Sequence, residues 1–373
     1  MSGPDSASRR ALLGALALSS GLAACGSPTM PSSPTPVPEP PLPSRTPADC
    51  SPAPHRFSGG QPLRHGDTGH GIVDERIRYL LPLALSPDGR ELAGSYRDAI
   101  VVWEAATGKA ARVLATASWT DVLAWSPDGV ELATEDAEGV ARLDAACGSS
   151  LGELRGHRRV VSEAGAASRV TGAVFSPDGR RLLTTGADGT LRSWAVADGS
   201  PLTKVDLDAP RHPTVSPDGS TVVVTTGDAT ASLHSVRDLS RTARLESASS
   251  RWRFLDDATL IGGTATGKVL GVSVADGHER ELFTVPGRVR DVTLSPDGAV
   301  AVTQTEDEGA WLTRLDGPAR PVLLPRLDWF GGAIAGACFS PDGQSVYVCD
   351  QFTGIAAYTA SGALGYRFEA PAG

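Results

Sequence analysis

The chain has 373 residues, of which 40% are hydrophobic, 42 are glycine and 28 are proline, and its formal net charge is −9. This much glycine and proline argues against a helical bundle, and the length suits one large β domain. The acidic balance argues against a nucleic-acid partner, because a protein that neutralises phosphates needs a clustered positive surface.

The first 24 residues have the pattern of an export signal. Arg9 and Arg10 precede an apolar run from Ala11 to Ala24, which at 14 residues is too short to span a bilayer. We therefore expect residues 1–24 to be a signal peptide, with Arg9 and Arg10 as the export signal.

Two resemblances refine this expectation. Leu22-Ala23-Ala24-Cys25 resembles the lipobox of bacterial lipoproteins, which implies that the thiol of Cys25 is acylated and that Cys25 becomes the mature N-terminus. Ser8 to Leu13 resembles the twin-arginine export motif, but a Sec signal also begins with positive charge, so both routes stay open. An ordinary secretory peptide with a chance cysteine is the alternative. The lipoprotein interpretation predicts that the protein lies at the extracellular face of the cell membrane and contacts the membrane through its lipid only.

Residues 25–54 have the composition of a tether. Eleven prolines stand between Gly26 and Pro54, and such a segment cannot bury a core. We expect it to be disordered and to hold the next domain up to roughly 90 Å from the membrane. Residues 55–75 form a polar lead-in, whose His65, Asp67 and His70 match no established ligand spacing. We expect no metal site and no cofactor.

A Ser-Pro-Asp-Gly motif recurs in the rest of the chain. Proline sets φ near −65°, aspartate can hydrogen-bond the local backbone, and glycine accepts the positive φ that closes a hairpin. Each copy therefore predicts a turn between two strands. The copies begin at Ser86, Ser126, Ser176, Ser216, Ser295 and Ser340.

The long interval between Ser216 and Ser295 hides a worn copy. Phe254 to Ile261 repeats the pattern of Phe175 to Leu183, with its turn residues replaced and one residue deleted. Seven units result, and each has room for four short strands. Because this is the pattern of radially stacked blades, we predict an all-β fold in residues 76–373: a seven-bladed β-propeller with four-stranded antiparallel blades.

The units resemble WD40 repeats, most clearly at Leu182 to Trp194 and at Ile100 to Lys109. This resemblance implies an interaction module. One Gly-His pair, Gly156-His157, precedes a blade, although extra residues separate it from the first strand. The family's third-strand tryptophan place is held by Trp103 and Trp194, and by Leu143, Leu315 and Tyr358 in other units. We therefore expect the family's network of Asp, His, Ser and Trp to be missing from most blades.

Ring closure and cysteine pairing each leave two alternatives. The outer strand of the last blade comes either from residues 362–369 or from residues 61–64 before the first blade. Cys338 and Cys349 flank the last turn on adjacent strands, so they form either a disulfide or two buried thiols. A disulfide there leaves Cys50 and Cys147 as the remaining pair.

Two segments match catalytic motifs without the required context. Gly262 to Lys268 follows most of a phosphate-binding loop, but Val269 replaces Ser or Thr and no helix follows, so we expect a hairpin. Gly148 to Gly152 fits a nucleophile elbow, which needs a strand-to-helix turn, whereas this segment joins two strands of a blade. We predict no catalytic residues and no enzyme activity.

The turns all lie on one face of a propeller, here called the turn face. The loops that enter first strands, and those that join second to third strands, share the opposite loop face. Extra residues in 158–169 and 326–332 both fall on the loop face, and such extended loops usually carry function. Arginine and aromatic residues, which are enriched at binding hot spots, gather there. The candidate binding face is Tyr79, Trp119, Arg169, Arg211, Arg288, Arg290, Trp329 and Phe330.

Acidic residues of the second-to-third-strand loops are expected to surround this face as a rim, among them Glu135, Asp228 and Glu306. Core capping and ordinary solvated loops explain the same residues equally well. The leading hypothesis is an exported, lipid-anchored, non-enzymatic propeller that docks an unidentified protein or peptide at the cell surface. A propeller that binds a small ligand or glycan, with or without hydrolysis, is the alternative. A structural spacer of the envelope is a third.

Overall fold

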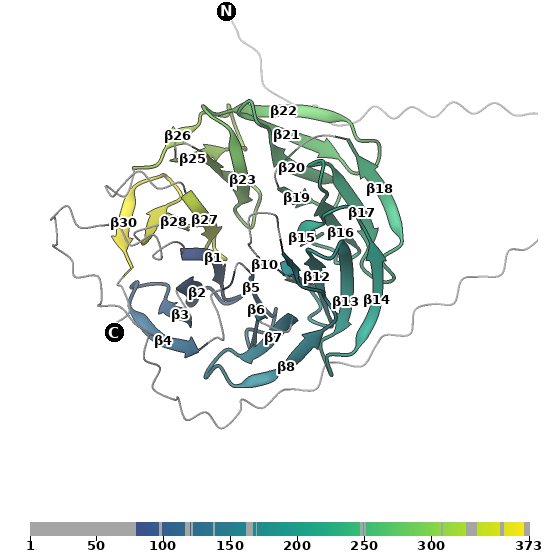
Figure 1. The fold of residues 1–373 in the computed structure, drawn as a ribbon. Coiled ribbons are helices and arrows are strands. Elements are labelled where there is room, and N and C mark those ends of the chain that lie inside the picture. Colours follow the sequence, from purple (N-terminus) through teal and green to yellow (C-terminus); the bar gives the residue numbers. More distant parts are fainter. Residues whose placement is uncertain are drawn as a thin grey trace, which may run out of the picture. The chain divides into compact units, whose positions relative to one another are not determined.

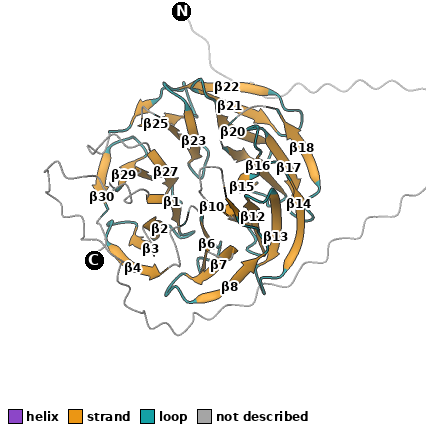
Figure 2. Ribbon diagram, in the orientation of Figure 1, coloured by secondary structure: helices purple, strands orange, loops and turns teal. Residues whose placement is uncertain are grey.

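Seven four-stranded antiparallel sheets form a ring in the computed structural model, which confirms the predicted seven-bladed propeller (Figure 1). The structure describes residues 80–368 except 97–98, 116–119, 121, 137–138, 162–166, 169, 247–248, 250, 307–308, 326–333 and 351–353. These residues form strands and turns and no helix (Figure 2), and accordingly no membrane-spanning helix is found among them. The predicted signal peptide, tether and lead-in, with Arg9, Arg10 and Cys25, lie outside the described residues.

The first strand of each blade lies nearest the ring centre and the fourth lies outermost (Figure 1). Blade 1 consists of β1 (Leu80–Leu85), β2 (Glu91–Tyr96), β3 (Ala99–Glu104) and β4 (Ala110–Ala115). Blade 2 consists of β5 (Leu123–Trp125), β6 (Glu131–Asp136), β7 (Gly139–Asp144) and β8 (Ser150–Arg155). After a small hairpin of β9 (Val160–Val161) and β10 (Ala167–Ser168), blade 3 consists of β11 (Val170–Phe175), β12 (Arg181–Gly186), β13 (Thr190–Ala195) and β14 (Pro201–Asp206).

The remaining four blades follow the same order. Blade 4 consists of β15 (Arg211–Val215), β16 (Thr221–Thr225), β17 (Ala231–Ser235) and β18 (Arg241–Leu245). Blade 5 consists of β19 (Trp252–Asp256), β20 (Thr259–Gly263), β21 (Lys268–Ser273) and β22 (Glu279–Thr284). Blade 6 consists of β23 (Val289–Leu294), β24 (Val300–Thr305), β25 (Gly309–Arg314) and β26 (Val322–Leu323). Blade 7 consists of β27 (Ile334–Phe339), β28 (Ser345–Asp350), β29 (Ile355–Thr359) and β30 (Leu364–Arg367).

Each Ser-Pro-Asp-Gly motif forms the turn between the first two strands of its blade, as predicted. In blade 3, the hydroxyl of Ser176 donates to Asp178 Oδ1 over 2.6 Å and accepts from the N–H of Arg181 over 3.0 Å. Gly179 takes a φ of +70°, which glycine adopts without strain. The Ser-to-Asp hydrogen bond recurs in all six intact motifs. The sequence of the motif thus encodes a rigid hairpin.

Blade 5 carries the worn copy, which confirms the seventh unit. Its turn contains only Asp257 and Ala258, between β19 and β20. The N–H of Ala258 donates to Asp256 Oδ1 over 2.9 Å, and Asp257 Oδ1 accepts from the N–H of Asp218 in blade 4 over 2.8 Å. A carboxylate contact between blades therefore replaces the internal serine contact.

The core lies between the blades. The buried apolar side chains form seven clusters, one at each interface between neighbouring blades. Alternation along each strand sends side chains to both neighbouring blades, so a blade has no core of its own.

The last blade takes its outer strand from the C-terminal end, since β30 pairs with β29. This settles the choice in favour of residues 362–369, and residues 61–64 lie outside the described part of the chain. Side chains then close the ring: Trp103 of blade 1 and Tyr347 of blade 7 share one buried cluster, and Phe368 packs against it.

Cys338 and Cys349 are thiols and form no disulfide with each other. Strand pairing places Cys338 opposite Tyr347 and Cys349 opposite Gly336. The two cysteines are therefore diagonal neighbours, with Cβ atoms roughly 7 Å apart, which exceeds the roughly 4 Å that a disulfide needs. The disulfide alternative is wrong for this reason of register.

Strand pairing also corrects the predicted residue at the third-strand tryptophan place of blade 6. Leu182 lies opposite Trp194, and the same register in blade 6 places Ala301 opposite Thr313. Thr313 therefore holds the tryptophan place, and not Leu315, which follows the end of β25. The N–H of Leu315 instead donates to the carbonyl of Ala299 over 2.7 Å.

Candidate functional site

The loop face carries a cluster of arginines where three consecutive first strands begin. Arg211 is the first residue of β15 in blade 4, Arg251 and Arg253 lie at the start of blade 5, and Arg288 and Arg290 lie at the start of blade 6. These five residues are here called the arginine mouth. Arg211, Arg288 and Arg290 are exposed, whereas Arg251 and Arg253 are partly buried.

Asp291 holds the blade 5 arginines in place. Its carboxylate, which is only 5% exposed, accepts from Arg251 Nη1 over 3.0 Å and from Arg253 Nη2 over 2.9 Å. Burial raises the pKa of Asp291, but Arg253 and Arg251 more than offset this effect and lower the pKa to about 2. The carboxylate therefore stays ionised and ties blade 6 to blade 5.

His212 lies within electrostatic reach of the same cluster. Burial lowers the pKa of His212, and the positive charge of Arg251 lowers it further, to about 3. The imidazole is thus neutral near pH 7. His212 also has a φ of +52°, which is uncommon for a residue other than glycine and recurs at functional sites.

The structure places only part of the predicted binding face. Arg211, Arg288 and Arg290 lie on the loop face as expected, and Arg290 pairs with Glu306 of the predicted acidic rim over 3.3 Å. Asp228 of the rim pairs with Arg244 over 2.5 Å, so at least these two rim carboxylates are engaged. The remaining predicted residues lie outside the described residues: Tyr79, Trp119, Arg169, Trp329 and Phe330.

Sequence reasoning missed Arg251, Arg253, His212 and Asp291. The sequence does contain a hint of these residues, since Arg253 and Asp291 interrupt apolar strand segments at positions expected to be buried. A buried charge usually has a partner, but only the ring brings Arg253 beside Asp291.

Blade 3 contains the hydrogen-bond network that the WD40 resemblance implies. Trp194 Nε1 donates to Thr184 Oγ1 over 2.8 Å, and His157 Nε2 lies 2.8 Å from the same hydroxyl. His157 Nδ1 lies 3.1 Å from Asp188 Oδ1. Since a carboxylate only accepts, Nδ1 carries the proton and Thr184 donates to Nε2.

This network anchors the long loop before blade 3. Burial lowers the pKa of His157, which keeps the imidazole neutral. Asp188 Oδ2 also accepts from the N–H of Arg158 over 3.0 Å, so the loop is held at two consecutive residues, His157 and Arg158. The extra residues then form the β9–β10 hairpin, which lies near the ring centre in the view of Figure 1.

The two segments that match catalytic motifs lie in hairpins. Gly262 and Gly263 end β20 and pair with Leu270 and Val269 of β21, which confirms the predicted hairpin. Gly148 to Gly152 join β7 to β8. Among the described residues, no group of three or more His, Cys, Asp or Glu side chains is arranged to hold a metal ion.

The fold and the blade 3 network define the class of this protein as a seven-bladed β-propeller with WD40-like repeats. Residues 148–195 match the family model described as "WD domain, G-beta repeat". Among solved structures, the chain is similar to Kuenenia stuttgartiensis hydrazine synthase, with 17% identity and a TM-score of 0.62 over 79% of this chain and 99% of that chain. This likeness concerns the fold alone, which 1855 chains of solved structures match, and such a common fold selects no function. No curated protein matches the chain.

Proposed function

We propose that this protein is an exported, lipid-anchored interaction module that binds an acidic segment of a protein partner at its arginine mouth. The observation that carries the proposal is the pair Arg211 and Arg288, which are exposed and have no ion-pair partner among the described residues. They flank Arg251 and Arg253, whose positions are fixed by Asp291.

The chemistry of the mouth favours carboxylates. Guanidinium groups bind carboxylates through two parallel hydrogen bonds, and arginine is among the residues that dominate binding energy at interfaces. WD40-like propellers commonly act as interaction modules, which supports a protein partner. Electrostatic attraction of this kind weakens as salt concentration rises.

The mouth is less suited to hydrolysis. Asp291 is its buried carboxylate, and the pKa of about 2 keeps this group ionised and paired with two arginines. His212, with a pKa of about 3, is a weak base at neutral pH. General acid and base catalysis works best with pKa values near the working pH, so these groups support docking.

The state of Cys147 supports export, because this residue is disulfide-bonded. Disulfides persist in oxidising compartments outside the cytoplasm. The signal pattern of residues 1–24 and the lipobox at Cys25 also favour a location outside the cytoplasm. Acyl labelling should attach lipid to the wild type and not to Cys25→Ala, and a labelled variant contradicts the anchor.

Crosslinking on intact cells tests the docking surface. The partner caught by the wild-type protein should be recovered less with Arg211→Ser combined with Arg288→Ser, since each exposed ion pair contributes up to about 1 kcal/mol and two together up to about thirtyfold in affinity. Arg241→Ser, an exposed arginine on the outer strand of blade 4, is the matched control and should leave recovery unchanged. Recovery of the partner by the double variant at the wild-type level contradicts the proposal.

A further inference from the structure

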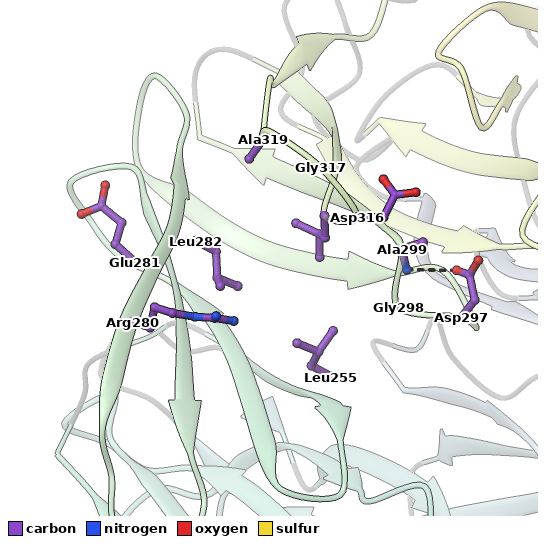
Figure 3. Close-up of a pocket in the computed structure, with 11 residues that line it drawn as sticks. Leu255, Arg280, Glu281, Leu282, Asp297, Gly298, Ala299, Asp316, Gly317 and Ala319 are labelled. Atoms are coloured by element: carbon purple, nitrogen blue, oxygen red, sulfur yellow. Dashed lines mark hydrogen bonds between the residues drawn. The ribbon is translucent and has the colours of Figure 1, made fainter. Parts of the chain in front are cut away.

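The turn face has a groove between blades 5 and 6, opposite the arginine mouth. Its volume is about 500 Å³, which falls in the range of ligand sites. Leu255 and Leu282 of blade 5 and Leu315 of blade 6 line it, and the side chain of Arg280 extends between Leu255 and Leu282 (Figure 3). The groove is open to solvent.

The first cause of the groove is the worn turn of blade 5. At other interfaces the glycine of one turn faces the proline of the preceding blade's turn, as Gly219 faces Pro177 and Gly343 faces Pro296. The two-residue turn of blade 5 has no such proline, and Leu255 faces Gly298 instead. The loss of the regular turn leaves an apolar side chain at the rim of the interface.

The second cause is a pair of small side chains. In blades 1 and 3 the tryptophan place faces the preceding blade: Trp103 packs with Tyr347, and Trp194 packs with Leu154. In blade 6 this place holds Thr313, paired with Ala301. Its buried hydroxyl has no hydrogen-bond partner among the described residues. The blade 5–6 interface thus lacks the tryptophan ring that fills the equivalent space in blades 1 and 3.

The third cause is the segment between β25 and β26. In blade 3 the corresponding segment forms a tight turn closed by Gly199, whose N–H donates to the carbonyl of Ala195 over 2.8 Å. Blade 6 has Leu315 to Pro321 here, with prolines at 318 and 321. Proline cannot donate to a strand ladder, and β26 is only two residues long. The segment forms one wall of the groove.

Within the described part of the chain, two of the four charged side chains that line the groove are held in ion pairs, whereas Arg280 and Asp297 are not. Asp316 pairs with Arg314 over 2.6 Å, and Glu281 pairs with Lys268 over 2.8 Å. Asp297 accepts from the hydroxyl of Ser295 and from the N–H of Ala299. Arg280 has no ion-pair partner among the described residues, and its guanidinium lies in the groove (Figure 3).

We propose that this groove is a second binding site, which takes an extended peptide of a partner protein with a carboxylate next to a leucine-sized apolar side chain. The carboxylate pairs with Arg280, and the apolar side chain covers Leu255, Leu282 and Leu315. The open shape suits a chain that enters and leaves the groove. Because the site lies on the turn face and uses none of the mouth residues, it stands independently of the loop-face proposal.

The test is an NMR titration of the full mature protein labelled at leucine methyl groups, which makes Leu255, Leu282 and Leu315 the reporters. The probe is the blocked tripeptide acetyl-Leu-Asp-Leu-amide, added to about 10 mM so that millimolar dissociation constants are covered. We expect saturable shifts at these three residues. Arg280→Gln should weaken binding by up to about fivefold, as the loss of one exposed ion pair predicts. Arg367→Gln, an exposed arginine on the outer strand of blade 7, should leave binding unchanged.

A blocking variant gives a second readout. A Cβ on Gly317 would meet no heavy atom within 4 Å, so this position accepts a side chain, and the ring of Gly317→Phe at the groove should abolish the shifts. Acetyl-Leu-Asn-Leu-amide should bind the wild type more weakly than the Asp peptide, by up to about fivefold. Absent shifts, shifts that persist in Arg280→Gln and Gly317→Phe, or shifts caused by octanoate and not by the peptide would each overturn the proposal.

Discussion

Phe368 meets Trp103 edge to face, with ring centroids 6.1 Å apart and ring planes at 85°. The two residues come from opposite ends of the described chain, and Phe368 also packs against Tyr347, with centroids 5.8 Å apart. The hydroxyl of Tyr366 donates to the carbonyl of Ala105. An aromatic contact, and not a shared strand, therefore joins blade 7 to blade 1.

Removing the ring of Phe368 should open this closure. We expect Phe368→Ala to lower the free energy of unfolding by about 2 to 3 kcal/mol, below the full cost of a buried phenylalanine because Phe368 is partly exposed. Chemical denaturation measures the change. Leu364→Ala, at the start of β30 and 42% exposed, is the control and should cost less than about 0.5 kcal/mol. Equal losses in the two variants contradict closure by Phe368.

Arg142 clamps blade 2 to blade 3 in a buried setting. Its Nη2 donates to Glu131 Oε2 over 2.8 Å and to the carbonyl of Val196 over 2.5 Å, and both ionic side chains are nearly inaccessible. Arg142→Met leaves the carboxylate of Glu131 buried without its guanidinium, so we expect a loss of about 3 to 5 kcal/mol. Arg155→Met, from the exposed pair with Glu153, should change stability by less than about 1 kcal/mol. A loss below about 1 kcal/mol in Arg142→Met argues against the clamp.

His212 should make the protein acid-sensitive. Its pKa in the folded state is about 3, below the ordinary value of 6.5, so between these values the unfolded chain binds a proton that the folded chain does not. Stability therefore falls as the pH drops from about 6.5 toward 3, by at most about 1.4 kcal/mol per pH unit. Asp291, whose pKa is lowered, loses its contribution only below about pH 3.8.

Denaturation at pH 7.0 and 4.5 checks the role of His212. His212→Asn, which tolerates a positive φ, should show a smaller loss of stability between the two pH values. Part of the loss should remain, since His157 and His234 also have pKa values lowered by burial. An unchanged loss in the variant shows that His212 does not titrate in this range.

Cys147 should be linked to Cys50. Cys338 and Cys349 are thiols, and acylation would consume the thiol of Cys25, which leaves Cys50 as the partner of the disulfide-bonded Cys147. Peptide mass mapping without reductant should find this pair. Reduction should cost up to about 4.7 kcal/mol, the chain-entropy value for a loop of about 100 residues. A Cys147 peptide linked to a cysteine other than Cys50 contradicts this assignment.

Burial raises the pKa of the Cys338 thiol to about 12, so Cys338 should resist alkylation until the protein unfolds.

The repeat made the blades predictable because each turn is a local structure. Ser176, Asp178 and Gly179 contact residues within five positions along the chain, so their pattern is readable without the rest of the fold. The same logic recovered the worn copy at Leu255. It failed at Thr313, since the position opposite Ala301 depends on strand register, and Leu315, the apolar residue two positions later, was assigned instead.

The candidate sites were less predictable. Arg211, Arg288 and Arg290 were found from their place before first strands, but Arg253 beside Asp291 depends on two blades meeting. The groove at Arg280 lies on the turn face, which the sequence had marked as the regular one. The sequence nevertheless contains the features that produce the groove: the worn turn of blade 5 and the small residues Ala301 and Thr313.

By itself the sequence determined the number of blades and the turn chemistry, because these rest on local patterns of neighbouring residues. The tertiary structure alone decided how the ring closes, which cysteines stay apart, and where charges from different blades meet. Strand register separates Cys338 from Cys349, because it offsets them by two residues. The packing of blade 6 against blade 5 brings Asp291 to Arg253. Such contacts between distant segments leave no periodic trace in the chain.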